Sequence, residues 1–528
     1  MKNMLFEPVV ATATNGNHAS KSYVEPAHVG SDGYQEDYAP DALELVRSLC
    51  QALREAAINY CHWKSNNALD RSANGKNDLD LLVDRADAMR FAQILNALGF
   101  KQAFAPAEDD MPGVLDYYGH DVAAGRIIHV HAHFQIMMGQ DMTKNYHLPL
   151  EAAYLESATQ GALFRTPSPE FELIVLVLRL MVKHATWDTI LMGLGQLSPS
   201  EQSELTDLQA EADPQQIDAI LREHVPFISP TLFADCLRAL KKRSPLWRRI
   251  RAARKVSNAL AAHTRRTPTV DLLRKLWGRG WGIVWRRLLA GQQGSQRRLA
   301  LGGALIAVVG GDGAGKTSTI EHLRGWLGKE LQTRTVHLGK PEWSLTTRMV
   351  RALLKVVRVL LRASYIEEAP VLYQPDARPS TLTVYSLALR AVCAARDRQR
   401  TYAEARRAAN RGELVICDRF PLPQLKMMEG AQVAQLVDEN DMNWFLRRLH
   451  RLELHYLQHI LPPDLLIVLR LDPEIAVVRR SDEDPHPVRV RNRESGKRRG
   501  RAAAARDRRR QPQDDVLAQV RQIVWSKI

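Results

Sequence analysis

The sequence has few of the features that mark secreted or membrane-spanning proteins. Its 528 residues contain only five cysteines, scattered without paired spacing: Cys50, Cys61, Cys236, Cys393 and Cys417. This scatter excludes a cysteine-based zinc site and favours a reducing compartment. No apolar run reaches the ~18 residues that a transmembrane helix needs, and the N-terminal region lacks the apolar core of a secretory signal. We therefore expect a cytoplasmic protein.

Acidic and basic residues are unevenly divided along the chain. Residues 1–240 contain 17 Lys and Arg against 32 Asp and Glu, a balance of −15, and the remainder contains 56 against 27, a balance of +29. Such a division indicates separate modules, the second of which handles anions. Phosphates, an acidic surface and nucleic acid all remain compatible with that charge, but no nucleic-acid-binding fingerprint is present.

A chain of this length is expected to form two or three domains. Residues 1–40 are rich in small and polar types and are expected to be a disordered tail. Strand and helix patterns between residues 41 and 160 predict a small α+β unit, and residues 161–262 read as a helical region. A basic, glycine-interrupted linker covers residues 263–300, and a new domain is expected over residues 301–528.

The last of these domains opens with a glycine-rich loop. An apolar run, Ala304 to Val309, leads into the pattern G-x₄-G-K-[ST] of a P-loop, and an amphipathic helix is expected to follow. Glycines allow successive N–H groups to point at phosphate oxygens, and the helix presents its positive end to the same anion. The pattern therefore predicts binding of ATP and Mg²⁺ by Gly310, Gly311, Asp312, Gly313, Ala314, Gly315, Lys316, Thr317 and Ser318. Within this set, Lys316 is expected to reach the β- and γ-phosphates and Thr317 to ligate Mg²⁺.

Later motifs narrow the kind of P-loop protein. A helix bearing Arg396 and Arg398 precedes the apolar strand Leu414 to Asp418, which closes in Asp-Arg-aromatic, and the strand Pro463 to Glu474 is followed by an arginine-rich segment. In order and spacing, residues 301–528 resemble thymidylate kinases. The resemblance implies a P-loop NTPase domain, with a three-layer α/β/α architecture around a parallel sheet, that transfers the γ-phosphate of ATP.

The resemblance also implies roles for individual residues. Asp312 matches the acid that contacts the acceptor sugar, and Asp418 matches the carboxylate that holds Mg²⁺ or orients the acceptor phosphate. Arg419 is its neighbour in that motif, and Arg398, or Arg396 in a shifted register, matches the arginine on the acceptor phosphate. Arg489 and Arg491 match the lid arginines. Gly339-Lys340-Pro341 stands where the family usually has an Arg-Glu-Pro clamp, and this departure leaves the acceptor open.

The N-terminal region carries a second set of acidic residues. Asp78 and Asp80 alternate in an apolar strand after His62-Trp63-Lys64-Ser65, so both carboxylates can converge on metal ions. This pattern resembles the nucleotidyltransferase superfamily, which implies an α+β nucleotidyltransferase-like domain with Asp78 and Asp80 as metal ligands. The strand expected to bring a third acid reads His129-Val130-His131-Ala132-His133, in which only neighbouring imidazoles could share an ion. A substrate-binding or degenerate module is the alternative.

Three functions follow for the whole chain. The first is a nucleoside monophosphate kinase with dTMP as the first acceptor. The second is a nucleotidyltransferase–kinase fusion acting on a sugar or another non-thymidine acceptor in surface polysaccharide metabolism, and the third is a non-catalytic ATP-binding regulator. The expected partners are ATP and a phosphorylated small molecule, and a homodimer is compatible with the sequence. Trp277, Trp281 and Trp285 favour packing between domains over contact with a membrane surface.

Overall fold

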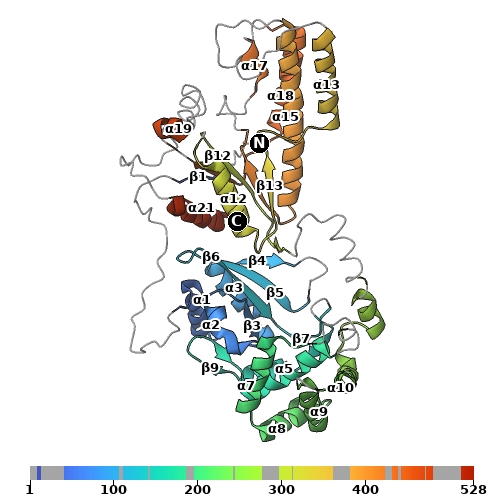
Figure 1. Ribbon diagram of the computed structural model, residues 1–528. Helices are drawn as coiled ribbons and strands as arrows, with labels where there is room; N and C mark the ends of the chain where they lie inside the picture. Colours follow the sequence, from blue (N-terminus) through green and yellow to red (C-terminus); the bar gives the residue numbers. More distant parts are fainter. Residues whose placement is uncertain are drawn as a thin grey trace, which may run out of the picture. The chain divides into compact units, whose positions relative to one another are not determined.

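The chain divides into two compact units in the computed structural model (Figure 1). One unit comprises residues 26–297 and the other comprises residues 1–25 together with residues 298–528. The structure describes residues 9–13, 41–105, 111–140, 143–185, 189, 196–241, 244–275, 277, 296–311, 313–360, 381–421, 431–437, 442–469, 471, 473–479 and 513–528. Among the helices in these ranges, none is both long and apolar enough to cross a bilayer.

A parallel sheet organises the C-terminal unit. Its strands run in the order β1 (Val9–Ala13), β15 (Leu465–Leu469), β12 (Leu305–Gly310), β14 (Leu414–Asp418) and β13 (Thr333–His337). Every neighbouring pair is parallel. The three central strands β15, β12 and β14 are short, mostly apolar and buried, as parallel strands covered on both faces require, whereas the edge strand β13 is largely polar. The predicted α/β class with a parallel sheet is confirmed.

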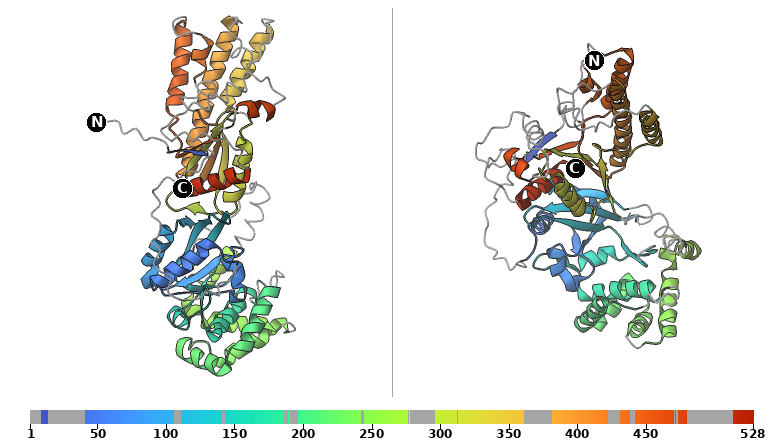
Figure 2. Two further views of the ribbon diagram at one scale, coloured as in Figure 1. Left: turned by 90° about the vertical axis from the view of Figure 1, so that its left-hand side faces the viewer. Right: turned by 45° about the horizontal axis from the view of Figure 1, so that its top comes forward.

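Helices cover both faces of this sheet (Figure 2). Alternate residues of β12, among them Leu305, Ala307 and Val309, share a core with α15 (Thr381–Ala409). On the opposite face lie α12 (Lys316–Leu327) and α21 (Gln513–Lys527), which contact each other and the sheet. The long α15 continues beyond the sheet and packs against α13 (Leu345–Leu360), α17 (Val433–Leu436) and α18 (Trp444–Gln458).

The first strand of the sheet comes from the segment expected to be a tail. Val9–Ala13 pairs with Leu465–Leu469 in parallel and so forms one edge of the sheet. Residues 1–40 therefore contain a strand where the sequence composition predicts only disorder. The short apolar stretch of β1 carries no periodic signal, and its partner lies more than four hundred residues further along the chain.

A mixed sheet forms the centre of the N-terminal unit. The strands β4 (Lys101–Phe104), β5 (Val114–Asp121), β6 (Arg126–His133), β3 (Leu79–Val83) and β2 (Tyr60–His62) lie side by side in that order. The pair β3–β6 is parallel and the other three pairs are antiparallel. Helices α1 (Glu44–Glu55) and α3 (Ala88–Ala97) share a buried core with this sheet. The helix and strand patterns predicted for these segments are confirmed.

The helical region belongs to the same unit as the mixed sheet. It contains α5 (Pro169–His184), α7 (Pro199–Glu211), α8 (Pro214–His224), α9 (Pro230–Leu240) and α10 (Leu246–Ala259). The core of these helices includes Cys61 of β2, Leu82 of β3 and Trp63, which follows β2. It also includes residues of the hairpin formed by β7 (Ile136–Met138) and β8 (Tyr146–Leu148). The helices therefore share one hydrophobic core with the mixed sheet. The boundary between the two compact units lies between Arg297 and Arg298.

Candidate functional site

The glycine-rich loop joins β12 to α12 in the C-terminal unit. Gly313 and Gly315 adopt φ values of 75° and 87°, a left-handed conformation that glycine adopts most readily. A Cβ atom at Gly310 would lie 2.6 Å from the Leu469 carbonyl oxygen, so the close approach of β15 requires glycine there. Asp312 lies outside the described residues. The loop therefore has the strand–loop–helix context that the sequence predicts.

The amine of Lys316 folds back over this loop. Its Nζ donates hydrogen bonds to the carbonyl oxygens of Gly310, at 3.1 Å, and Gly311, at 2.9 Å. Thr317 and Ser318 are exposed in the first turn of α12. A positive helix end beside a lysine and two exposed hydroxyls can bind an anion and a hydrated divalent cation.

Asp418 lies at the carboxyl end of the neighbouring strand. Because Val308 and Asp418 are paired in parallel register, Asp418 and the glycine-rich loop lie at the same edge of the sheet. The Asp418 side chain is 28% exposed, with His337 Nε2 at 3.9 Å from its Oδ2. Arg419 follows with φ of 59°, and its N–H donates to the Val308 carbonyl at 3.3 Å.

The two candidate arginines of α15 take different positions. Arg398 is buried, and its Nε donates to the Leu338 carbonyl at 2.8 Å, next to the turn that follows β13. Arg396 donates to the hydroxyl of Ser344 at 2.5 Å, just before α13. Of these two, Arg398 lies against the Gly339-Lys340 segment. The lid candidates Arg489 and Arg491 lie outside the described residues.

A second polar cluster spans three strands of the N-terminal unit. In β6, His129, His131 and His133 alternate onto one face, as the strand pattern predicts. The parallel register sets Asp80 of β3 opposite His131, and the antiparallel register sets Asp116 of β5 opposite the same histidine. Asp80, His131 and Asp116 thus form a row across the sheet. Asp116 is a member that sequence reasoning missed, because the third acid was sought on the histidine strand.

His129 bridges two carboxylates. Its Nε2 lies 2.7 Å from Asp116 Oδ1 and its Nδ1 lies 3.1 Å from Asp78 Oδ1. Carboxylates only accept hydrogen bonds, so both ring nitrogens must carry protons. Burial by itself would lower the pKa of His129, but the hydrogen bonds to Asp116 and Asp78 outweigh it and raise the pKa to about 9. The Asp78 carboxylate, expected to be a metal ligand, therefore faces an imidazolium.

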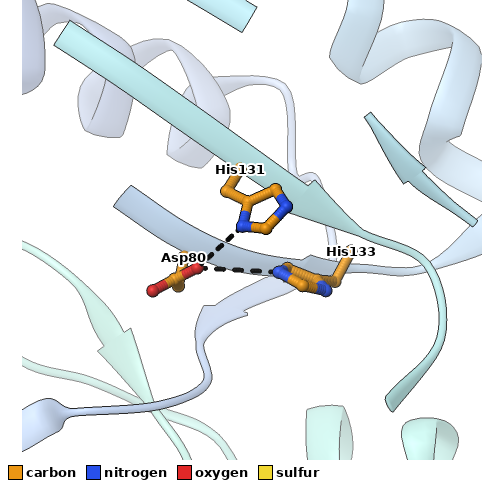
Figure 3. Close-up of side chains that lie close together, drawn as sticks. All are labelled: Asp80, His131 and His133. Atoms are coloured by element: carbon orange, nitrogen blue, oxygen red, sulfur yellow. Dashed lines mark hydrogen bonds and ion pairs between the residues drawn. The ribbon is translucent and has the colours of Figure 1, made fainter. Parts of the chain in front are cut away.

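Asp80 and two histidines converge a few ångströms away (Figure 3). Asp80 Oδ1 lies 3.2 Å from His131 Nδ1, 3.6 Å from His133 Nε2 and 2.8 Å from Lys64 Nζ. Burial alone would raise the pKa of Asp80, but the charge of Lys64 and the hydrogen bond with His131 hold it well below the usual range. Burial lowers the pKa of both His131 and His133. Ligand atoms of the three residues all lie within 4.8 Å of one another, so they can hold a metal ion.

The helical region holds the loop that leads into this cluster. Ser65 has φ of 60°, and its N–H donates to Glu204 Oε1 of α7 at 3.2 Å. Burial raises the pKa of Glu172 of α5 to about 7. Both glutamates are buried. No local sequence signal indicates these contacts, because Ser65 and Glu204 are separated by 139 positions.

Comparison with known proteins supports the N-terminal assignment. Residues 75–210 match the model of a family described as uncharacterised nucleotidyltransferase, and this range contains β3, β5, β6, α5 and all of α7 but its last residue. Residues 75–210 therefore form a nucleotidyltransferase-like domain, which indicates a transferase. The predicted module is confirmed at that level.

The likeness to solved structures is weak. A thymidylate kinase from Ehrlichia chaffeensis aligns with 17% identity, covering 36% of this chain and 95% of that chain, with a TM-score of 0.19. At that TM-score the likeness does not establish a shared fold. No curated protein matches the sequence.

Proposed function

We propose that the C-terminal unit is an ATP-dependent phosphotransferase that passes the γ-phosphate to a nucleoside monophosphate, with dTMP as the first acceptor to test. The observation that carries this proposal is the amine of Lys316, 3.1 and 2.9 Å from the carbonyl oxygens of Gly310 and Gly311, at the start of α12. An amine in that position can turn outward to the β- and γ-phosphates when a triphosphate enters the loop.

Other residues around the loop are proposed to bind the phosphates, the Mg²⁺ ion and the acceptor. The loop amides of residues 310–315 and the positive end of α12 bind the phosphate chain. Thr317 and Asp418 are the residues proposed to hold Mg²⁺, which neutralises charge on the β- and γ-phosphate oxygens when bound. Arg398 is proposed to orient the acceptor phosphate or the turn that contacts it. The lid arginines Arg489 and Arg491 are proposed to stabilise charge on the transferred phosphoryl group.

The segment expected to contact the acceptor differs from that of thymidylate kinases. Lys340 stands where thymidylate kinases carry a guanidinium clamp, and an ammonium group binds phosphate as a point charge without the bidentate fork. A screen of acceptors with the full-length protein should therefore include nucleoside monophosphates and sugar phosphates together.

The test compares Lys316→Ala with Lys329→Ala. Lys329 is an exposed lysine just after α12, so its removal changes the charge equally but leaves the loop intact. We expect acceptor-dependent ADP release to fall by at least a hundredfold in Lys316→Ala and to stay within twofold in Lys329→Ala. Equal rates in both variants would contradict the proposal. ATP binding without turnover for any acceptor would favour the non-catalytic regulator instead.

A second function is supported by the nucleotidyltransferase-like domain at residues 75–210. We propose that this domain transfers a nucleotidyl group and that the kinase serves the same pathway, with a sugar or another non-thymidine acceptor used in surface polysaccharide. The test is pyrophosphate release from a panel of nucleoside triphosphates, compared between the wild type and the Asp78→Asn/Asp80→Asn variant. Release that is equal in the two proteins, or absent with every triphosphate, would contradict this function.

A further inference from the structure

We infer that Asp80, His131 and His133 form a site for one divalent transition-metal ion of the zinc class. This site differs from the Mg²⁺ site proposed beside the glycine-rich loop, and it does not depend on phosphoryl transfer. It also differs from the expected pair of Asp78 and Asp80, because the Asp78 carboxylate faces His129.

The backbone positions these three side chains for a common ligand. His131 and His133 are two residues apart in β6 and face the same way, and Asp80 lies on the adjacent parallel strand opposite His131. The separations from Asp80 Oδ1 are 3.2 Å to His131 Nδ1 and 3.6 Å to His133 Nε2. A tetrahedral ion with bonds of ~2.0–2.1 Å requires ligand atoms about 3.3–3.4 Å apart. The two separations lie on either side of that value.

His133 gives an independent indication of a missing ligand. It is only 1% exposed, and within the described part of the chain neither of its ring nitrogens has a hydrogen-bond partner. The edge of Trp63 packs against the ring, with centroids 4.9 Å apart, and fixes its position. Buried polar groups are normally paired, so a nitrogen that points at Asp80 without reaching it indicates an absent partner between them.

The chemistry of the ligand atoms selects the class of metal. Two imidazole nitrogens and one carboxylate oxygen suit Zn²⁺ and its first-row neighbours, whereas Mg²⁺ prefers oxygen. On the far side of His131, Asp116 Oδ1 lies 3.7 Å from Nε2, where an outer carboxylate can orient a metal-binding imidazole. Three protein ligands leave one tetrahedral position for water or a substrate oxygen, as in catalytic zinc sites.

Lys64 must move when the metal binds. Its Nζ lies 2.8 Å from Asp80 Oδ1, and its side chain is 22% exposed, so it can withdraw toward solvent. In the absence of metal this ammonium group supplies the positive charge that the Asp80 carboxylate requires. Metal binding therefore replaces the Lys64 ammonium group by the metal ion as the cation beside Asp80 Oδ1.

The experiment titrates the full-length protein, freed of metal by a chelator, with Zn²⁺ and with Co²⁺ in the presence of excess Mg²⁺. Calorimetry measures the stoichiometry for Zn²⁺, and visible absorption reports nitrogen coordination of Co²⁺. We expect one equivalent per chain that Mg²⁺ does not displace. The variants Asp80→Asn and His133→Gln should each weaken binding at least tenfold, whereas the control His147→Gln should bind as the wild type does. His147 pairs with Glu151 in the same unit, away from the cluster.

Two further measurements keep the outcome decisive. Thermal unfolding of each metal-free variant checks that its fold is intact, and His131→Gln replaces His133→Gln if the more buried substitution unfolds the protein. The Lys316→Ala variant should bind Zn²⁺ with unchanged affinity, so a failed kinase test and a failed metal test are separable. Absence of an equimolar site, or equal binding by the wild type and every folded ligand variant, would overturn the inference.

Discussion

Glu172 allows a quantitative test of how a buried carboxyl group in α5 affects the stability of the folded protein. This carboxyl group is 7% exposed in the first turn of α5, and burial raises its pKa from 4.5 to about 7. The unfolded chain then releases the proton at a lower pH than the folded chain does. The folded state is therefore penalised as the pH rises from 4.5 to 7, and the penalty is complete above pH 7.

The size of the effect follows from that difference in pKa. A shift from 4.5 to about 7 is about 2.5 units, and each unit corresponds to ~1.36 kcal/mol, so the full penalty is about 3 kcal/mol. By the same linkage it amounts to less than ~1 kcal/mol at pH 5. The charges of the neighbouring Glu204 and Arg179 also affect the pKa of Glu172. We therefore expect a measured stability difference of about 1–3 kcal/mol.

The perturbation is Glu172→Gln, which keeps the shape of the side chain and removes its charge. We expect the variant to gain stability over the wild type as the pH rises, with the largest difference at pH 8. Urea unfolding followed by circular dichroism at several pH values between 5 and 8 measures this difference. Glu211→Gln, at an exposed position at the end of α7, is the control and should show none. A stability difference that is independent of pH, or a variant less stable at pH 8, would refute the reasoning.

Two further substitutions test the two sites. Gly310→Ala should lower the free energy of unfolding by about 1–3 kcal/mol and weaken the proposed ATP binding, because its Cβ would lie 2.6 Å from the Leu469 carbonyl oxygen. The control is Gly325→Ala in α12, where the new Cβ would meet no described atom within 4 Å beyond its chain neighbours and its own helix backbone, and it should stabilise the protein by ~1 kcal/mol. If both variants unfold at the same urea concentration, the close approach is not rigid. His129→Leu should destabilise the protein by on the order of 3 kcal/mol in thermal or urea unfolding, because it leaves Asp116 buried with only Arg297 as a charged partner. Wild-type stability in this variant would show that the imidazolium bridge contributes nothing.

Features that depend on a few consecutive residues were accessible from the sequence. The glycine-rich loop is contiguous, and its conformation follows from glycines that tolerate positive φ and from the helix start beside Lys316. The alternation of His129, His131 and His133 likewise follows from the period of two in a strand. The parallel sheet and the nucleotidyltransferase-like module were expected from the family resemblances that such motifs carry.

Other members of the sites could not be found in this way. Asp116 joins the cluster only because β5 pairs with β6 in one register, and a shift of a single residue would turn it to the other face. Glu204 holds the Ser65 backbone from a helix 139 positions away. The different positions of Arg396 and Arg398 depend on how α15 packs against the segments before α13 and after β13.

The sequence by itself determined the local patterns: a glycine-rich loop before a helix in one unit, and carboxylates and imidazoles on strands in the other. Only the tertiary structure decided which of these groups meet. It joined Asp80 with His131 and His133, engaged Asp78 with His129, and added β1 to the edge of the parallel sheet. The physical reason is that burial of the whole core sets strand register and helix packing. A short sequence pattern therefore does not indicate which residues, distant along the chain, will be its neighbours.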